Sequence, residues 1–311
     1  MSKSTTASTA RPNPPLFSSG RAVSVAIQGE LGAYSQQAVY SFFGRENVGK
    51  VLSLPTLQRV FSAISVETDA PDFAVVPLEN SLAGSIGETV DLLISSNVRI
   101  VGETSVQIEH CLLIHPKTSL DKIRRVMSHP QGLAQCREYL DKNGSKWEQV
   151  SVYDTAGSAK MIRDQGLLDT AGIASELAAE IYGMKIAAKG IEDDPTNTTR
   201  FVVIRNASSE KVDDASFGAN SERSAVEYKT SLIFATKHEP GCLVRALSAL
   251  SFRGINLNRI ESRPIRGKPW EYYFYVDFSG NEKDEICRKA IEDLRHQTEE
   301  LKILGSYVRR V

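Results

Sequence analysis

The chain has 311 residues, enough for about two or three compact units. Hydrophobic residues make up 41% and charged residues 24%, an ordinary globular composition, and the net charge is −1. So balanced a charge excludes a strong electrostatic footprint for nucleic acid or an anionic membrane. No apolar run approaches the roughly 20 residues of a membrane-spanning helix.

The N-terminal segment, residues 1–22, is rich in Ser, Thr, Ala and Pro. We expect a disordered tail, because prolines interrupt it and it shows little amphipathic pattern. It carries basic residues and no acid, so a targeting peptide, for instance to a plastid, is the alternative. The expected location is the cytoplasm. The 4 cysteines form no CxxC pair and are expected to be reduced, and the 5 histidines show no HxxxH spacing for a metal.

Strands and helices alternate up to about residue 205, which is typical of a parallel-sheet α/β architecture. The first set consists of strand 23–27, a glycine loop, helix 36–43 capped by Ser35, strand 73–76 ending at Pro77, helix 85–94 with Ser85 and Glu88 in capping-box spacing, and strand 98–101. The second set consists of strands 111–114, 123–127 and 171–174 and helices 131–140, 155–163 and 175–182. We expect two lobes, 23–105 with 190–205 and 106–189, with a ligand cleft between them.

The polar residues 206–228 are interpreted as a linker. The segment that follows has the order βαββαβ, a ferredoxin-like module. Its strands are expected at 231–235, 257–262, 272–278 and 301–308, separated by one helix that carries Leu243, Leu247 and Leu250 on one face and another at 285–299.

Polar side chains follow several of these strands, where α/β sheets bind ligands. Glu79, Asn80 and Ser81 come after the strand at 73–76, and the run 128–131 follows another. Each run alone also fits a surface turn or a helix cap, and Asp154 likewise fits a helix N-cap. Together the runs favour a ligand-binding site. The loop 29–35 lacks GxGxxG and GKS or GKT, so it indicates an anion at the next helix start rather than a nucleotide.

The run 193–201 is a turn-forming cluster that leads into the apolar stretch 201–204. Thr199 can donate a hydrogen bond, and Arg200 offers a planar fork suited to a carboxylate. These neighbours suggest a site for an acidic small molecule with an oxygen to be protonated. A strand start with an exposed arginine is the alternative for so short a run.

Several ordered motifs make the chain resemble prephenate dehydratases and their close relatives, the arogenate dehydratases. The motifs are Gly29-Glu30-Leu31-Gly32-Ala33-Tyr34-Ser35, Pro77-Leu78-Glu79-Asn80-Ser81, His110-Cys111-Leu112-Leu113, Ser128-His129-Pro130-Gln131 and Asn197-Thr198-Thr199-Arg200-Phe201. The end of the chain resembles the family's ACT domain through Gly241-Cys242-Leu243-Val244 and Glu261-Ser262-Arg263-Pro264. The resemblance implies a two-lobed, periplasmic-binding-protein-like catalytic domain at 23–205 and an ACT regulatory domain at 229–305.

The resemblance implies decarboxylating dehydration of prephenate to phenylpyruvate, or of arogenate to phenylalanine, with no cofactor. Thr199 would donate to the leaving hydroxyl, Arg200 would hold a substrate carboxylate or orient the site, and Phe201 would pack beneath it. The candidate substrate contacts are Ser35, Asn80, Ser81, Ser128 and Gln131, with His129 and Glu79 as weaker candidates. No chorismate mutase helices are expected before Val23.

The two ACT motifs imply phenylalanine binding between paired modules, and hence a homodimer or homotetramer. Cys242 replaces the usual Ala in the first motif. Two rival interpretations are a non-catalytic solute-binding protein and a regulatory protein with an inactive front half. The intact run Thr199-Arg200-Phe201 and the ACT module favour the enzyme.

Overall fold

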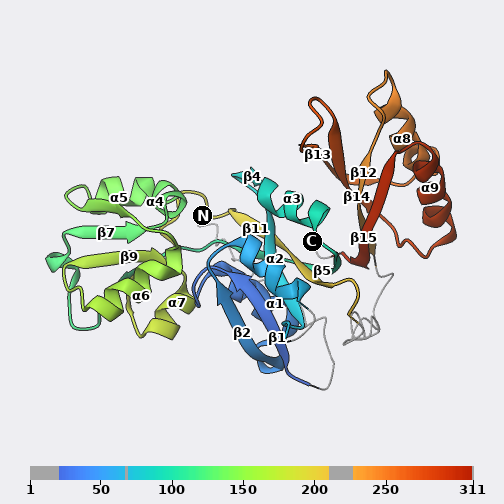
Figure 1. Ribbon diagram of the computed structural model, residues 1–311. Helices are drawn as coiled ribbons and strands as arrows, with labels where there is room; N and C mark the ends of the chain where they lie inside the picture. The colour runs from blue at the N-terminus through green and yellow to red at the C-terminus, as the bar shows by residue number, and fades with distance from the viewer. Residues whose placement is uncertain (1–20, 67–68, 210–226, 310–311) are drawn as a thin grey trace, which may run out of the picture.

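The computed structural model describes residues 21–66, 69–209 and 227–309. These residues form three sheets that lie in a row, with the sheet of the first strand in the middle (Figure 1). Most of the expected tail, 1–22, and of the expected linker, 206–228, lies outside the described residues. Within the described ranges, no helix is both long enough and apolar enough to cross a membrane.

The middle lobe is built on a sheet with the strand order β2-β1-β3-β11-β5, and the short β4 pairs with β3. Strands β1 and β3 are parallel, whereas β11 is antiparallel to both β3 and β5. The elements are β1 (Val23–Gln28), α1 (Tyr34–Phe43), η1 (Arg45–Asn47), β2 (Val48–Leu54), α2 (Leu57–Ser65), β3 (Phe73–Asn80), β4 (Gly84–Ser85), α3 (Gly87–Ser95), β5 (Val98–Gln107) and β11 (Thr198–Asn206).

The second lobe has the strand order β10-β6-β9-β7-β8. Its elements are β6 (Cys111–Ile114), η2 (Leu120–Lys122), β7 (Arg125–Ser128), α4 (Pro130–Ala134), α5 (Arg137–Asn143), β8 (Glu148–Ser151), α6 (Thr155–Gln165), β9 (Thr170–Ala174), α7 (Glu176–Tyr182) and β10 (Lys185–Lys189). The chain enters this lobe after β5 and returns through the neighbouring β11. The expected two-lobed α/β architecture is confirmed, but the expectation of parallel sheets is wrong in part, because β6 and β11 run antiparallel to the strands beside them.

The third sheet has the order β13-β14-β12-β15. Its elements are β12 (Tyr228–Ala235), α8 (Cys242–Ser251), β13 (Leu257–Pro264), β14 (Tyr272–Ser279), α9 (Glu285–His296) and β15 (Glu300–Val308), in the βαββαβ order expected from the sequence. Helices α8 and α9 cover one face, where Phe234 and Phe278 are buried.

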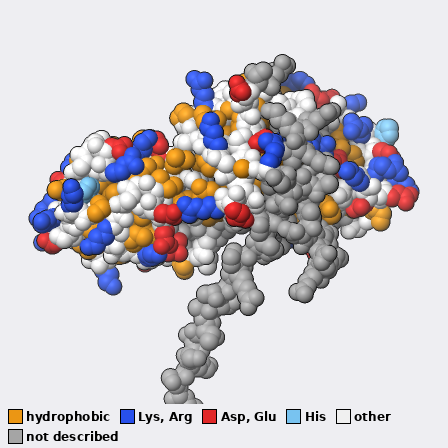
Figure 2. Space-filling view, turned by 90° about the horizontal axis from the view of Figure 1, so that it is seen from below, with side chains coloured by type: hydrophobic (Ala, Val, Ile, Leu, Met, Phe, Trp, Pro, Cys, Tyr) orange, Lys and Arg blue, Asp and Glu red, His pale blue; other side chains and the backbone are white. Residues whose placement is uncertain are grey.

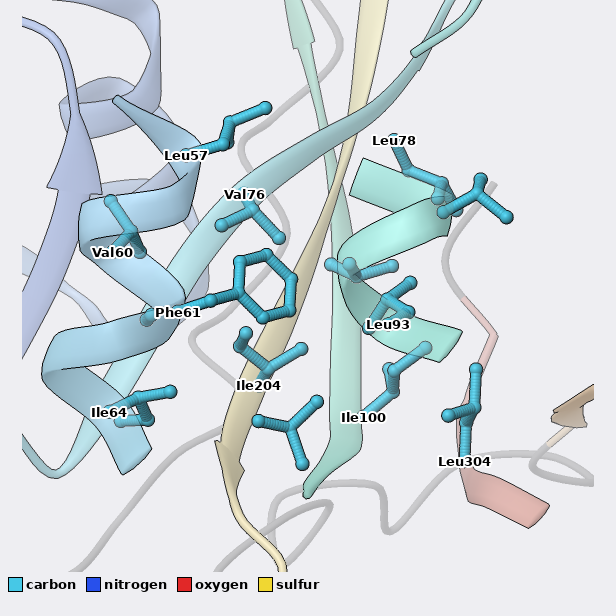
Figure 3. Packing of buried hydrophobic residues seen from close by; sticks show 14 of the residues in the cluster. Leu57, Val60, Phe61, Ile64, Val76, Leu78, Leu93, Ile100, Ile204 and Leu304 are labelled. Carbon is cyan, nitrogen blue, oxygen red and sulfur yellow. The ribbon is translucent and has the colours of Figure 1, made fainter. Parts of the chain in front are cut away.

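The other face of this sheet packs against the middle lobe. Tyr275 and Leu304 belong to the same buried cluster as Phe61 of α2 and Ile100 of β5. Figure 3 shows Leu304 with these middle-lobe side chains. The buried side chains on this face of the C-terminal sheet therefore form one hydrophobic core with those of the middle lobe, which carries β11.

Local details differ from the sequence prediction where backbone pairing overrides turn signals. Helix α1 begins at Tyr34 after the N-cap Ala33, so Ser35 lies inside the helix and does not cap it. Strand β3 continues through Pro77 to Asn80, because the register with β11 shifts there and a bulge tolerates a residue without an N–H.

Other differences concern elements with weak or interrupted patterns. Ser85 lies in β4 and α3 begins at Gly87, so the expected capping box is absent. The helix expected at 131–140 is split into α4 and α5. The prediction missed β2, α2, β8 and β10.

Charged side chains of both signs are interspersed on the face shown in Figure 2, in keeping with the net charge of −1. All four cysteines are buried free thiols.

Candidate active site

A cleft of about 530 Å³ lies between the two α/β lobes. The middle lobe contributes residues of α1, β3, β4 and β11, and the second lobe contributes the residues that begin α4 and α6. Its polar lining residues are Gln28, Tyr34, Ser35, Asn80, Ser85, Glu88, His110, His129, Gln131, Gln135, Tyr153, Asp154, Thr155 and Thr199. Among the described residues that line it, none is a lysine or arginine.

Thr199 and Asn80 face each other across β11 and β3. The Asn80 oxygen accepts from the backbone N–H groups of Leu82 and Ala83, at 3.1 and 2.9 Å. This fixes the amide so that its Nδ2 donates to Thr199 Oγ1 at 2.9 Å and to Asn197 Oδ1 at 2.7 Å. Since the Thr199 oxygen accepts from Asn80, its own proton is left to donate into the cleft.

Arg200 points away from the cleft, because successive side chains of a strand alternate between its faces. Thr199 and Phe201 line the cleft and Arg200 does not. Its guanidinium forms an ion pair with Glu79, and its Nη1 lies 3.9 Å from carboxylate oxygens of Glu103 and of Asp277. Burial opposes the charge, yet Asp277 and the other carboxylates raise the pKa of Arg200 above its usual value. Contact with a substrate carboxylate does not fit this placement, whereas an orienting role does.

Three expected contact residues line the cleft near helix starts. Ser35 lies in the first turn of α1, whose N-cap Ala33 provides no side-chain acceptor. His129 is the N-cap of α4, and its Nδ1 accepts from the Gln131 N–H at 3.2 Å. The Ser35 hydroxyl and the Gln131 side-chain amide therefore supply donors to this wall.

Two further candidates, Ser81 and Ser128, lie outside the cleft lining. Ser81 exchanges two hydrogen bonds with the Thr198 backbone, which extends the pairing of β3 with β11. Ser128 is buried and donates to the Ile173 carbonyl at 2.8 Å. An added Cβ at Gly132, which does line the cleft, would lie 2.6 Å from Ser128 Oγ, so this serine supports the wall from behind.

A series of hydrogen-bonded side chains in the cleft was not predicted from the sequence. Tyr34 Oη lies 2.8 Å from the Glu109 carbonyl and 2.9 Å from His110 Nδ1, and His110 Nε2 lies 2.9 Å from Gln135 Oε1. Burial lowers the pKa of His110, so the imidazole is neutral at pH 7. Tyr34 and His110 both belong to motifs that carried the family resemblance, whereas Gln135 had no signal beyond its helical position.

Asp154 also lines the cleft, and burial raises its pKa above the usual value. It caps α6 by accepting from the Gly157 N–H at 2.8 Å, as the sequence predicted. Nearby, Tyr153 and Lys160 of the second lobe bind the carboxylate of Glu30, which joins the two lobes beside the cleft. Across the described ranges, no group of three or more His, Cys, Asp or Glu residues could hold a metal ion.

The two expected regulatory motifs do not meet within one chain. Gly241, Cys242, Leu243 and Val244 begin α8 and line a hollow of about 200 Å³. Glu261, Ser262, Arg263 and Pro264 belong to β13 and do not line it. Instead, Glu261 accepts from the Ser85 hydroxyl, and Arg263 binds Asp91 of α3 through two hydrogen bonds of 2.7 and 2.6 Å.

Comparison with known proteins gives consistent matches. The family model for prephenate dehydratase matches residues 25–209. Arogenate dehydratase/prephenate dehydratase 2, chloroplastic, of Arabidopsis thaliana is 40% identical, over 93% of this chain and 74% of that protein. Among solved structures, prephenate dehydratase in complex with L-Phe from Arthrobacter aurescens has a TM-score of 0.79 at 27% identity, covering 92% of this chain and 90% of that one.

A further solved structure, GqqA, described as a novel type of quorum quenching acylase, has a TM-score of 0.79 at 31% identity. It covers 92% of this chain and 98% of that one. The family model spans more than half of the chain, and the plant relative aligns over most of both proteins. The chain therefore belongs to the prephenate dehydratase family.

Proposed function

We propose that the cleft around Thr199 converts prephenate to phenylpyruvate with loss of carbon dioxide and water. The observation that carries this assignment is the hydrogen bond from Asn80 Nδ2 to Thr199 Oγ1, 2.9 Å long. This bond occupies the threonine oxygen as an acceptor and leaves its proton for the ring hydroxyl of the substrate.

The reaction needs a positioned donor more than a strong acid. As the carbon–carboxylate bond breaks, its electron pair enters the ring and the ring hydroxyl leaves, so negative charge develops on that oxygen. A donor aimed at such an oxygen is worth about 2.7–4 kcal/mol, by analogy with an oxyanion-hole donor. The Asn80 bond strengthens the Thr199 donor, because hydrogen bonds in series polarise one another. Phe201 packs beneath the site.

The cleft suits a carboxylate that has to be lost. A cation clamped on that carboxylate would stabilise the ground state, and only interactions that are stronger in the transition state accelerate the step. Neutral donors line the cleft instead, among them the Ser35 hydroxyl and the Gln131 amide, beside the carboxyl groups of Glu88 and Asp154. Ser35 lies in the first turn of α1, and helix N-termini bind anions. His129 completes the proposed substrate contacts, Asn80 acts through the Thr199 hydroxyl, and Ser81 and Ser128 support the wall.

Arogenate is the alternative substrate, because the name of the plant relative includes both activities. Arogenate carries an amino group where prephenate has a keto group, and its product would be phenylalanine. The structural neighbour from Arthrobacter aurescens was solved with L-Phe. We propose that phenylalanine regulates this chain too, and that the protein acts in the cytoplasm.

The proposed regulatory site needs a second copy of the chain. Gly241 is the N-cap of α8 and has a φ of +78°, a conformation that favours glycine, and the motif it starts lines a hollow. The motif 261–264 faces α3 of its own chain. Phenylalanine between two ACT modules would therefore use Gly241 to Val244 of one copy and Glu261 to Pro264 of the other, in a homodimer or homotetramer.

The test is to supply purified protein with prephenate and with arogenate separately, and to follow phenylpyruvate and phenylalanine. Thr199→Ala should lower turnover about 10²–10³-fold. Thr198→Ala is the matched control, because that hydroxyl donates to the Thr196 carbonyl and does not line the cleft. Product from neither substrate would favour a solute-binding protein or an inactive regulator, and unchanged turnover in Thr199→Ala would remove the assigned donor.

A further inference from the structure

A cluster of five charged side chains joins the middle lobe to the C-terminal sheet. Glu79, Glu103 and Arg200 come from β3, β5 and β11, whereas Lys229 and Asp277 come from β12 and β14 of the C-terminal sheet. Lys229 Nζ lies 2.6 and 2.8 Å from the two Glu103 oxygens, and Arg200 pairs with Glu79. Each domain therefore supplies both signs of charge to the junction.

Asp277 is held at this junction by hydrogen bonding within its own sheet and by a cation of the middle lobe. The residue is 0% exposed, and its Oδ1 accepts from Ser231 Oγ at 2.5 Å. Its Oδ2 is buried without a hydrogen-bond partner in the described ranges, and it lies 3.9 Å from Arg200 Nη1. A buried carboxylate oxygen without a hydrogen bond is costly unless a cation compensates for it. The positions of Asp277 and Arg200 therefore depend on each other.

Arg200, the cation that faces Asp277, is the neighbour in sequence of the proposed donor Thr199. Arg200 follows Thr199 on β11, and its partner Glu79 precedes Asn80 on β3. The Asn80–Thr199 pair thus lies on the cleft side of two strands whose opposite side carries the Glu79–Arg200 ion pair. The Arg200 side chain and the Thr199 hydroxyl therefore share one short segment of β11, through which strain at the guanidinium can reach the donor.

We propose that Asp277 is a positioning residue for the dehydration. Its carboxylate holds Arg200 from the C-terminal sheet, and Arg200 fixes the register at which Thr199 meets Asn80. The regulatory domain then completes the geometry of the catalytic site from the opposite face of β11. This inference rests on the proposed function for its assay.

The test is a double-mutant cycle on prephenate turnover with Asp277→Asn, Arg200→Gln and the combination. Asp277→Asn should lower kcat about tenfold while KM changes less than about twofold, because the cleft lining is untouched. The double variant should be no slower than Arg200→Gln alone, because residues that act as a unit are not additive.

Thr230→Val is the matched control in the same sheet. Thr230 is buried, and its hydroxyl bonds Gly280 and Ser306 of its own domain. Its kcat should stay within about twofold of wild type, and its effect should multiply with that of Arg200→Gln. If Asp277→Asn does not fold, Asp277→Glu takes its place in the cycle, because it keeps the negative charge but moves it by one methylene.

The proposal is overturned if the Asp277 variant keeps kcat within about twofold, or if its effect multiplies with that of Arg200→Gln as independent sites do. Wild-type turnover distinguishes this failure from failure of the proposed function, since an active wild type with unaffected Asp277 variants overturns only this inference. With an inactive wild type, the same cycle on the thermal midpoint decides whether Asp277 and Arg200 are coupled, and additive shifts would overturn the contact.

Discussion

Asn80 Nδ2 donates to Thr199 Oγ1 at 2.9 Å, between residues that lie opposite each other in the β3–β11 ladder. The Asn80 oxygen is occupied by two backbone N–H groups of the following turn. The amide therefore cannot rotate without losing these bonds, and the direction of the Thr199 hydroxyl is set by the backbone. A weakly acidic side chain becomes a useful donor because it needs no reorganisation at the moment of reaction.

Asn80→Asp should lower kcat for prephenate about 100-fold. The carboxylate has nearly the same shape, but it accepts the Thr199 proton and no longer donates to the Thr199 oxygen. Steady-state turnover measures the effect, and a circular dichroism spectrum checks the fold. Asn97→Asp is the control, because that amide donates to the exposed Ser208 hydroxyl. A full wild-type rate in Asn80→Asp would show that the direction of this bond does not matter.

Gly32→Ala should destabilise the fold more than Gly166→Ala, although both glycines have a positive φ, +88° and +63°. The conformation alone costs about 1–2 kcal/mol for alanine. An added Cβ at Gly32 would lie 2.6 Å from the Ala178 Cα of the second lobe, whereas Gly166 has nothing within 4 Å. We therefore expect the Gly32 variant to lose about 1–3 kcal/mol more, as in an overpacked core. Urea unfolding of both variants measures the difference, and equal losses would contradict the crowding argument.

His110 should make the protein lose stability as the pH falls below about 6.5, the ordinary value for histidine. Burial lowers the pKa of His110 in the folded state, so the unfolded chain takes up this proton first. With more protons bound to the unfolded state, the free energy of unfolding falls with decreasing pH between the unfolded and folded pKa values. His110→Gln should be less stable at pH 8 and should show a shallower decline between pH 6.5 and 5. Parallel curves for the two proteins would contradict a depressed pKa.

The order of the major elements followed from the sequence because buried strands and amphipathic helices have strong periodic signals. Strand β12 and helix α9 were found for this reason. Strands β2 and β10 were missed because each lies at the edge of its sheet, and their patterns carry exposed lysines in place of a continuous apolar run. Edge strands need less burial than central ones, so the sequence marks them poorly.

The placement of Arg200 needed the structure. The sequence indicated a loop up to Arg200 and a strand from Phe201, which left the arginine free to turn toward a ligand. Strand β11 begins at Thr198, so alternation sends Arg200 to the opposite side. Only the apolar side of β14 was visible in the sequence pattern, and the opposite side, which carries Tyr275 and Asp277, meets the middle lobe. Contacts between domains leave no local pattern of this kind.

Asp91→Asn should weaken the response of turnover to phenylalanine and leave turnover without phenylalanine within about twofold of wild type. Arg263 of the proposed effector motif binds both oxygens of Asp91, at 2.7 and 2.6 Å, and the first turn of the same helix carries Glu88, which lines the cleft. Asp91 itself does not line the cleft. The Arg263–Asp91 contact therefore links the effector motif to the cleft wall without taking part in the chemistry.

The measurement is turnover of prephenate over a phenylalanine series, with the thermal midpoint as a separate report of phenylalanine binding. The concentration for half-maximal response should rise about tenfold in Asp91→Asn, which corresponds to about 1.4 kcal/mol of coupling. Glu292→Gln, which breaks an exposed ion pair with Arg288 on α9, is the control and should respond as wild type does. If Asp91→Asn binds phenylalanine and responds as wild type does, the signal reaches the cleft by another route, for which the Arg200–Asp277 junction is the next contact to test.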